Sequence, residues 1–169
     1  MATGAIDYWI GELEEYDFNQ LCAKPAPSRW SLGQVYVHLI RATGNHLAQA
    51  EICLSTNDNA AETMSPNGVA LFRNNGFPDQ FIEGPPSNAN TTQPESKEGL
   101  MRDLLLLKQK ISQVEMLASS STFTGKTKHP GLLYFNGKEW LQFAEMHFRH
   151  HQRQKKRIDD FLKASNQRG

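Results

Sequence analysis

Apolar side chains recur with a helical period in four long segments of the chain. These segments cover about residues 5–21, 31–54, 96–118 and 136–163. In the third segment the apolar stripe consists of Leu104, Leu107, Ile111, Val114 and Ala118. No stretch alternates between apolar and polar positions for long enough to predict a strand. The pattern therefore predicts an all-α fold, in which residues 1–169 form a single four-helix-bundle domain.

Capping residues mark where two of these predicted helices begin. Ser31 and Gln34 have the spacing of a capping box, in which each side chain accepts a hydrogen bond from a backbone N–H at the helix entrance. Trp30, immediately before them, can pack on the first turn of that helix. Asn136 and Glu139 have the same spacing, so we expect the last helix to begin there and to end near residue 163.

A long insert separates the second predicted helix from the third. It covers about residues 55–95 and is rich in Asn, Gly, Pro, Ser and Thr, especially from Gly84 to Thr92. Loops of this length inside a domain are commonly functional, and we expect substrate contacts here. Ser65 and Pro66 form a good N-cap and first-turn pair, which predicts a short helix over Pro66–Arg73.

Polar residues interrupt the apolar seam of the last predicted helix only in its middle. The seam follows four- and three-residue steps through Trp140, Ala144, His147, His151, Gln154, Ile158 and Phe161. His147 and His151 therefore share one helix face. His38 lies on the inward face of the second predicted helix and can meet them there. Three neutral imidazoles with an open position suit a divalent metal ion, although hydrogen-bonded core histidines would give the same pattern.

The other three histidines fit this group less well. His150 is three residues from His147, but its own stripe continues through Arg153 and Arg157, which we expect to face water. His46 is eight residues after His38, or about 12 Å along a helix, so it cannot join the same set of ligands. His129 precedes Pro130 in a predicted loop, which indicates a surface or lid position.

Composition and absent motifs exclude several kinds of protein. The formal net charge is zero, and no run of residues is apolar enough for a membrane span. The N-terminal residues have no secretory signal, so we expect a cytoplasmic protein with Cys22 and Cys53 as free thiols. Phe148 stands where a zinc peptidase of the H-E-x-x-H type carries its glutamate.

A basic cluster near the C-terminus does not indicate a nucleic-acid partner. It comprises Arg149, Arg153, Lys155, Lys156 and Arg157. Two aspartates follow it directly, and no nucleic-acid-binding motif accompanies it. Cations also suit the C-terminal half of a helix. We therefore predict a solvated helix face and no nucleic-acid partner.

Two stretches of the chain resemble the DinB-like domain superfamily, which includes the YfiT-like metal-dependent hydrolases. They are residues 30–39, WSLGQVYVHL, and residues 139–151, EWLQFAEMHFRHH, and Gln154 after the second is also typical of that superfamily. The resemblance implies a four-helix bundle, usually a homodimer, with nickel or zinc as the metal ion. Carried over to this chain, its ligands are His38, His147 and His151.

The resemblance implies more than one activity. The leading hypothesis is a metal-dependent enzyme of the hydrolase type that acts on a small-molecule substrate. Alternatives are a thiol S-transferase that activates a low-molecular-weight thiol, a non-catalytic metal-binding protein, and a helical interaction protein.

No single residue is assigned as the general base. Glu145 points off the face of His147, so His150 and Tyr36 are the candidates.

Overall fold

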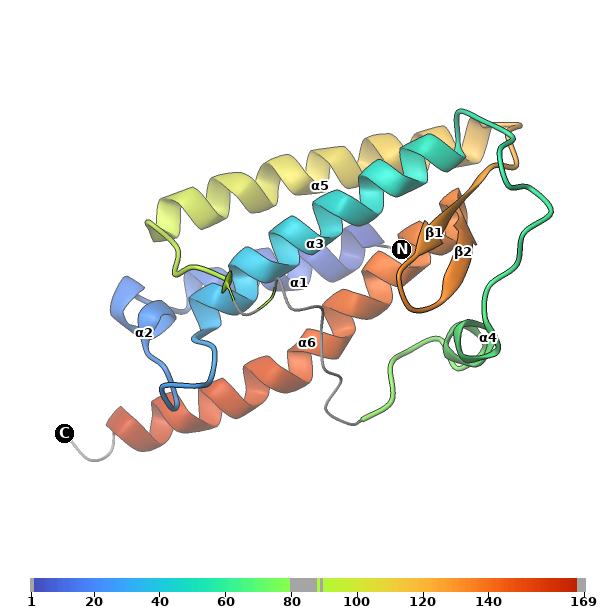
Figure 1. The fold of residues 1–169 in the computed structure, drawn as a ribbon. Coiled ribbons are helices and arrows are strands. Elements are labelled where there is room, and N and C mark those ends of the chain that lie inside the picture. The colour runs from blue at the N-terminus through green and yellow to red at the C-terminus, as the bar shows by residue number, and fades with distance from the viewer. Residues whose placement is uncertain (1, 80–87, 89, 167–169) are drawn as a thin grey trace.

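Four long helices dominate the computed structural model of the chain, which describes residues 2–79, 88 and 90–166. They are α1 (Ala2–Glu14), α3 (Leu32–Cys53), α5 (Lys97–Ser120) and α6 (Gly137–Asn166). Helix α3 packs on α5 and on α6, and α1 packs on the same two helices (Figure 1). The predicted helical class is confirmed.

The first predicted helix is in fact two helices. Helix α1 ends at Glu14, and the short α2 (Phe18–Cys22) begins after Asp17. The Asp17 carboxylate accepts a hydrogen bond from the Gln20 backbone N–H at 2.8 Å, and Gln20 Oε1 accepts one from the Asp17 N–H at 2.9 Å. This capping box starts a new helix where an uninterrupted one was predicted.

The other predicted helix starts are confirmed. The Ser31 hydroxyl accepts a hydrogen bond from the Gln34 N–H at 3.1 Å, and Gln34 Oε1 accepts one from the Ser31 N–H. Asn136 and Glu139 form the equivalent pair of bonds at the start of α6. Helix α6 continues to Asn166, one turn beyond its predicted end. The short α4 has the predicted bounds, Pro66–Arg73.

A small antiparallel hairpin precedes α6, although no strand was predicted. It pairs β1 (Lys126–His129) with β2 (Leu133–Asn136). Each strand has only four residues, too few to show an alternating pattern. Part of the predicted insert packs on this hairpin, since the Ser65 N–H donates to the Leu132 carbonyl at 2.9 Å and α4 lies beside the strands (Figure 1). Residues 80–87 and 89 of the insert lie outside the described residues.

A buried lysine joins α6 to α1. Lys155 is 3% exposed, and its ammonium lies 2.6 Å from a Glu12 carboxylate oxygen and 2.8 Å from one of Asp159. It also donates to the Tyr16 hydroxyl at 2.6 Å, which in turn donates to Asp159. The predicted solvated basic face is therefore wrong for Lys155. It is also wrong for Arg149 and Arg153, which donate hydrogen bonds to the backbone carbonyls of Asn75 and Phe77, whereas Lys156 and Arg157 are exposed.

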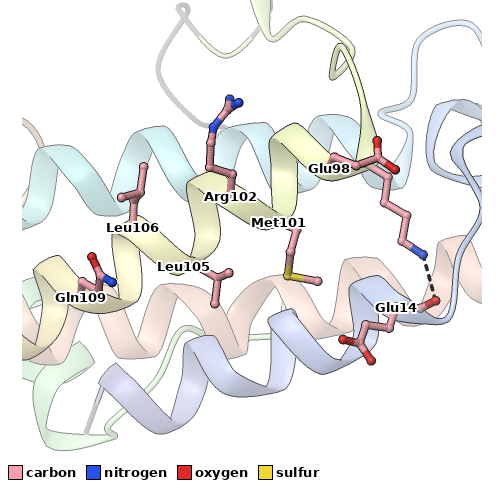
Figure 2. A pocket seen from close by; sticks show the side chains of 8 residues that line it. Glu14, Glu98, Met101, Arg102, Leu105, Leu106 and Gln109 are labelled. Atoms are coloured by element: carbon pink, nitrogen blue, oxygen red, sulfur yellow. Dashed lines mark hydrogen bonds between the residues drawn. The ribbon is translucent and has the colours of Figure 1, made fainter.

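A shallow apolar depression lies along α5 on the side of α1. Figure 2 shows Met101 and Leu105 projecting from α5 toward α1, with Glu14 and Glu98 at one end, whereas Leu106 projects from the other side of α5. Cys22 and Cys53 are free, as predicted. Among the described residues, no helix combines the length and apolar character that crossing a membrane requires.

Candidate metal centre

Two neighbouring helices bring three histidines together. Helix α3 contributes His38, and α6 contributes His147 and His151 from adjacent turns. The Nε2 atom of His147 lies 3.2 Å from that of His38 and 3.1 Å from that of His151. Each residue offers one nitrogen, and the three nitrogens lie within 4.8 Å of one another. The predicted grouping is confirmed, and the role of these residues as metal ligands stays a prediction.

Burial keeps these imidazoles neutral. His38 and His151 are 6% and 8% exposed, and His147 is half-buried. Burial lowers the pKa of His38 to about 4, and the nearby charge of Arg41 acts in the same direction. Burial also lowers the pKa of His151 to about 3 and that of His147 well below its usual value. At neutral pH the group is therefore a set of uncharged nitrogen donors, the form that binds metals.

Hydrogen bonding alone does not satisfy this group. A neutral ring nitrogen carries either one hydrogen or one lone pair, so Nε2 of His147 can form one good hydrogen bond. It nevertheless lies within hydrogen-bond distance of two other Nε2 atoms. One cation accepting a lone pair from each nitrogen would satisfy all three. Two nitrogens about 2.0–2.1 Å from a tetrahedral ion are roughly 3.3 Å apart, close to the two separations measured from Nε2 of His147. The residues therefore fit a metal ion.

Gln154 fixes the orientation of one of these rings. Its Oε1 atom lies 2.8 Å from Nδ1 of His151, and because an amide oxygen only accepts, that nitrogen carries the hydrogen. The lone pair of His151 is then on Nε2, which faces the other two histidines. Nδ1 of His38 and Nδ1 of His147 are buried and have no hydrogen-bond partner within the described residues. Gln154 is thus a supporting residue of the kind that commonly orients metal-binding histidines.

Replacement of Gln154 by leucine is expected to weaken metal binding by about 10–100-fold, because His151 loses the bond that fixes its tautomer and orientation. Competition with a chromophoric chelator would measure the affinity. Gln152→Leu is the matched control, since Gln152 lies on the same helix and is also half-buried, and its affinity should stay at the wild-type value. Equal affinities in the two variants would contradict the role assigned to Gln154.

The remaining histidines lie outside the group. The His150 ring lies 5.2 Å from that of His151 and 5.0 Å from that of Phe77, measured between centroids. His46 stacks on Trp140 and lies 5.6 Å from His147, and it is not among the three converging nitrogens, as predicted. His129 differs from its predicted surface or lid position, because it ends β1 half-buried against aromatic rings.

Two side chains considered for proton transfer are engaged elsewhere. The Tyr36 hydroxyl donates to the Trp9 carbonyl at 2.9 Å within the core, and burial raises its pKa. Tyr36 is therefore no candidate for a general base. The Glu145 carboxylate accepts from Arg149 at 2.6 Å, consistent with its predicted position off the histidine face.

One residue beside the histidines was not predicted. The Phe77 ring centroid lies 6.3 Å from that of His147 and 5.0 Å from that of His150. The sequence Asn74-Asn75-Gly76 after α4 indicates a turn, and Asn75 does adopt a φ of 49°. The sequence pattern does not show which surface Phe77 and its neighbours after this turn cover, because that depends on contacts with α6.

The fold and site define a mostly helical protein with three histidines that can hold one metal ion. Comparisons of the chain with known protein families, with curated proteins and with solved structures found no match. The function of the chain is therefore inferred from its own residues and from the resemblance in residues 30–39 and 139–151.

Proposed function

We propose that this chain is a DinB-like metal-dependent enzyme of the hydrolase type, with His38, His147 and His151 as the ligands of a divalent ion. The observation that carries the proposal is the convergence of three neutral Nε2 atoms that hydrogen bonding cannot satisfy together. The four long helices and the resemblance support a DinB-like bundle. The implied homodimer and cytoplasmic location stay predictions.

The chain's own residues would hold the ion and leave one position open. Three side chains fill three of the four positions of a tetrahedral site, the arrangement found in catalytic rather than structural zinc sites. A bound zinc or nickel ion would act as a Lewis acid and lower the pKa of a water or thiol in the remaining position. Gln154 keeps the lone pair of His151 directed to the ion, and the buried surroundings of His38 and His151 limit access of water.

A thiol S-transferase is the second candidate. Three neutral imidazoles leave the positive charge of a divalent ion uncompensated, because the group contains no carboxylate or thiolate. An anionic ligand at the open position is therefore favoured, and a thiolate is one such ligand. A metal-dependent reaction between a low-molecular-weight thiol and an electrophile, without ester or amide hydrolysis, would favour the transferase over the hydrolase.

Metal content tests the proposed site directly. The untagged, metal-free protein would be dialysed against zinc or nickel and analysed for bound ion. We expect about one ion per chain for the wild type and almost none for His147→Ala, because two remaining ligands bind weakly. His150→Ala is the matched control and should keep its ion, since His150 lies outside the group.

Two results would contradict the proposal. A wild-type chain that retains no ion would remove the metal site altogether. Equal loss of ion from the His150 and His147 variants would show that the ligand set is wrong. If the ion binds but no ester, amide or thiol substrate is turned over in a broad survey, the non-catalytic metal-binding alternative would replace the enzyme.

A further inference from the structure

The segment after α4 lies along α6 beside the histidine group. We call residues 74–79 the strap. Arg149 donates through Nη2 to the backbone carbonyl of Asn75 at 2.8 Å, and the Gln142 amide donates to Asn75 Oδ1 at 3.1 Å. These bonds hold the first half of the strap against the N-terminal half of α6.

A second arginine holds the other half of the strap. Arg153 donates through Nη2 to the Phe77 carbonyl at 2.9 Å, and its guanidinium lies 2.9 Å from a carboxylate oxygen of Asp79. Arg149 and Arg153 are four residues apart, so they lie on one face of α6, one turn from each other. The two arginines thus bind successive parts of the strap and fix its position along the helix.

This anchoring places Phe77 over the metal-binding face of α6. The Phe77 ring packs against Phe143 at 5.3 Å, as well as against His147 and His150. On the α3 side, the Trp30 ring lies 5.0 Å from that of His38. Both aromatic rings are half-buried. The two rings therefore flank the histidine group, with Phe77 beside His147 and Trp30 beside His38.

We propose that Phe77 determines the size of the ligands that reach the open position of the metal. This inference rests on the proposed function, because it assumes that the three histidines hold an ion. Arg153 fixes the backbone of Phe77, and the ring is packed against Phe143 and His150, so it can leave the histidines only by changing its rotamer against these neighbours. A small donor molecule can bind beside it, whereas a donor with a bulky substituent meets the ring.

Two monodentate nitrogen donors of different size provide the test. The cobalt-loaded protein would be titrated with imidazole and with 1-benzylimidazole, and the change in the visible spectrum would report each ligand entering the coordination sphere. We expect the wild type to bind imidazole at least about tenfold more tightly than 1-benzylimidazole. In Phe77→Ala this preference should fall to within about threefold, chiefly through tighter binding of 1-benzylimidazole.

Variants that loosen the strap or leave it intact complete the experiment. Arg153→Ala keeps the phenyl ring but removes its anchor, so the preference for imidazole should also decrease. Phe123→Ala and Arg102→Ala are the matched controls, because Phe123 is 47% exposed and the Arg102 side chain 70% exposed, and both should keep the wild-type preference.

The outcomes separate this inference from the proposed function. If cobalt does not bind to the wild type, the metal site itself fails. If cobalt binds but Phe77→Ala keeps the wild-type preference, the role of Phe77 is wrong while the metal site stands. Should Phe77→Ala lose its ion or its helical circular dichroism, Phe77→Leu and Arg153→Ala decide the question, and an unchanged preference in both would overturn the inference.

Discussion

Replacement of Lys155 by methionine is expected to lower the free energy of unfolding by about 2–4 kcal/mol. Burial alone lowers the pKa of Lys155, but hydrogen bonds to Asp159, Glu12 and Tyr16 outweigh it and raise the pKa, so the lysine stays charged. Without the ammonium, two partly buried carboxylates lose their shared partner. The loss of stability should be smaller than that for a fully buried ion pair, because these carboxylates retain some contact with water.

Urea denaturation would measure this effect, and the chain offers a matched control. Lys110 forms a comparably short ion pair with Glu51, but both side chains are well exposed, at 42% and 39%. Lys110→Met should therefore change the free energy of unfolding by less than about 1 kcal/mol. Similar losses in the two variants would show that the buried cluster contributes no more than a surface pair.

The metal-free protein should lose stability on acidification between about pH 6.5 and pH 4. Burial lowers the folded-state pKa of His38 to about 4 and those of His46 and His151 to about 3. The unfolded chain binds protons at these histidines first, near pH 6.5, so the free energy of unfolding falls as the pH falls. Each histidine contributes about 1.4 kcal/mol per pH unit over this range, which amounts to several kcal/mol by pH 5.

Urea denaturation at a series of pH values, with chelator present, would test this prediction. Above pH 7 these histidines should cause no pH dependence of the free energy of unfolding, because they are neutral in both the folded and the unfolded state. The slope of the unfolding free energy against pH reports the number of protons taken up on unfolding. In His38→Gln this number should be lower by about one between pH 6.5 and pH 5. Constant stability from pH 7 to pH 5 would contradict the neutral, buried state of the group.

Long periodic segments made most of the fold predictable. The seam of α6 and the capping box at Ser31 located the two helices that carry the histidines, and the apolar spacing favoured His151 over His150. The predictions failed where a local hydrogen bond or a short element decided the structure. Asp17 divides the first predicted helix, and the strands at 126–129 and 133–136 are too short for a pattern.

The surroundings of the site were less predictable than its histidines. Arg149 and Arg153 have the spacing of a solvated stripe, and only the folded chain shows that they bind the strap. Lys155 belongs to the same basic run, yet it is buried because Glu12 of α1 and Tyr16 of the turn after α1 approach it. Whether a charge on a helix faces water or a distant segment depends on contacts between elements, which helical periodicity does not contain.

The sequence separation of the ligands has a consequence for how the protein folds. His38 and His147 are 109 residues apart, so their nitrogens meet only after α3 and α6 have paired. In the unfolded chain an ion can bind only local groups such as His147, His150 and His151, and that weaker binding offsets part of its stabilisation of the native state. An ion should therefore stabilise mainly those states in which α3 and α6 are already paired, and slow the separation of these two helices.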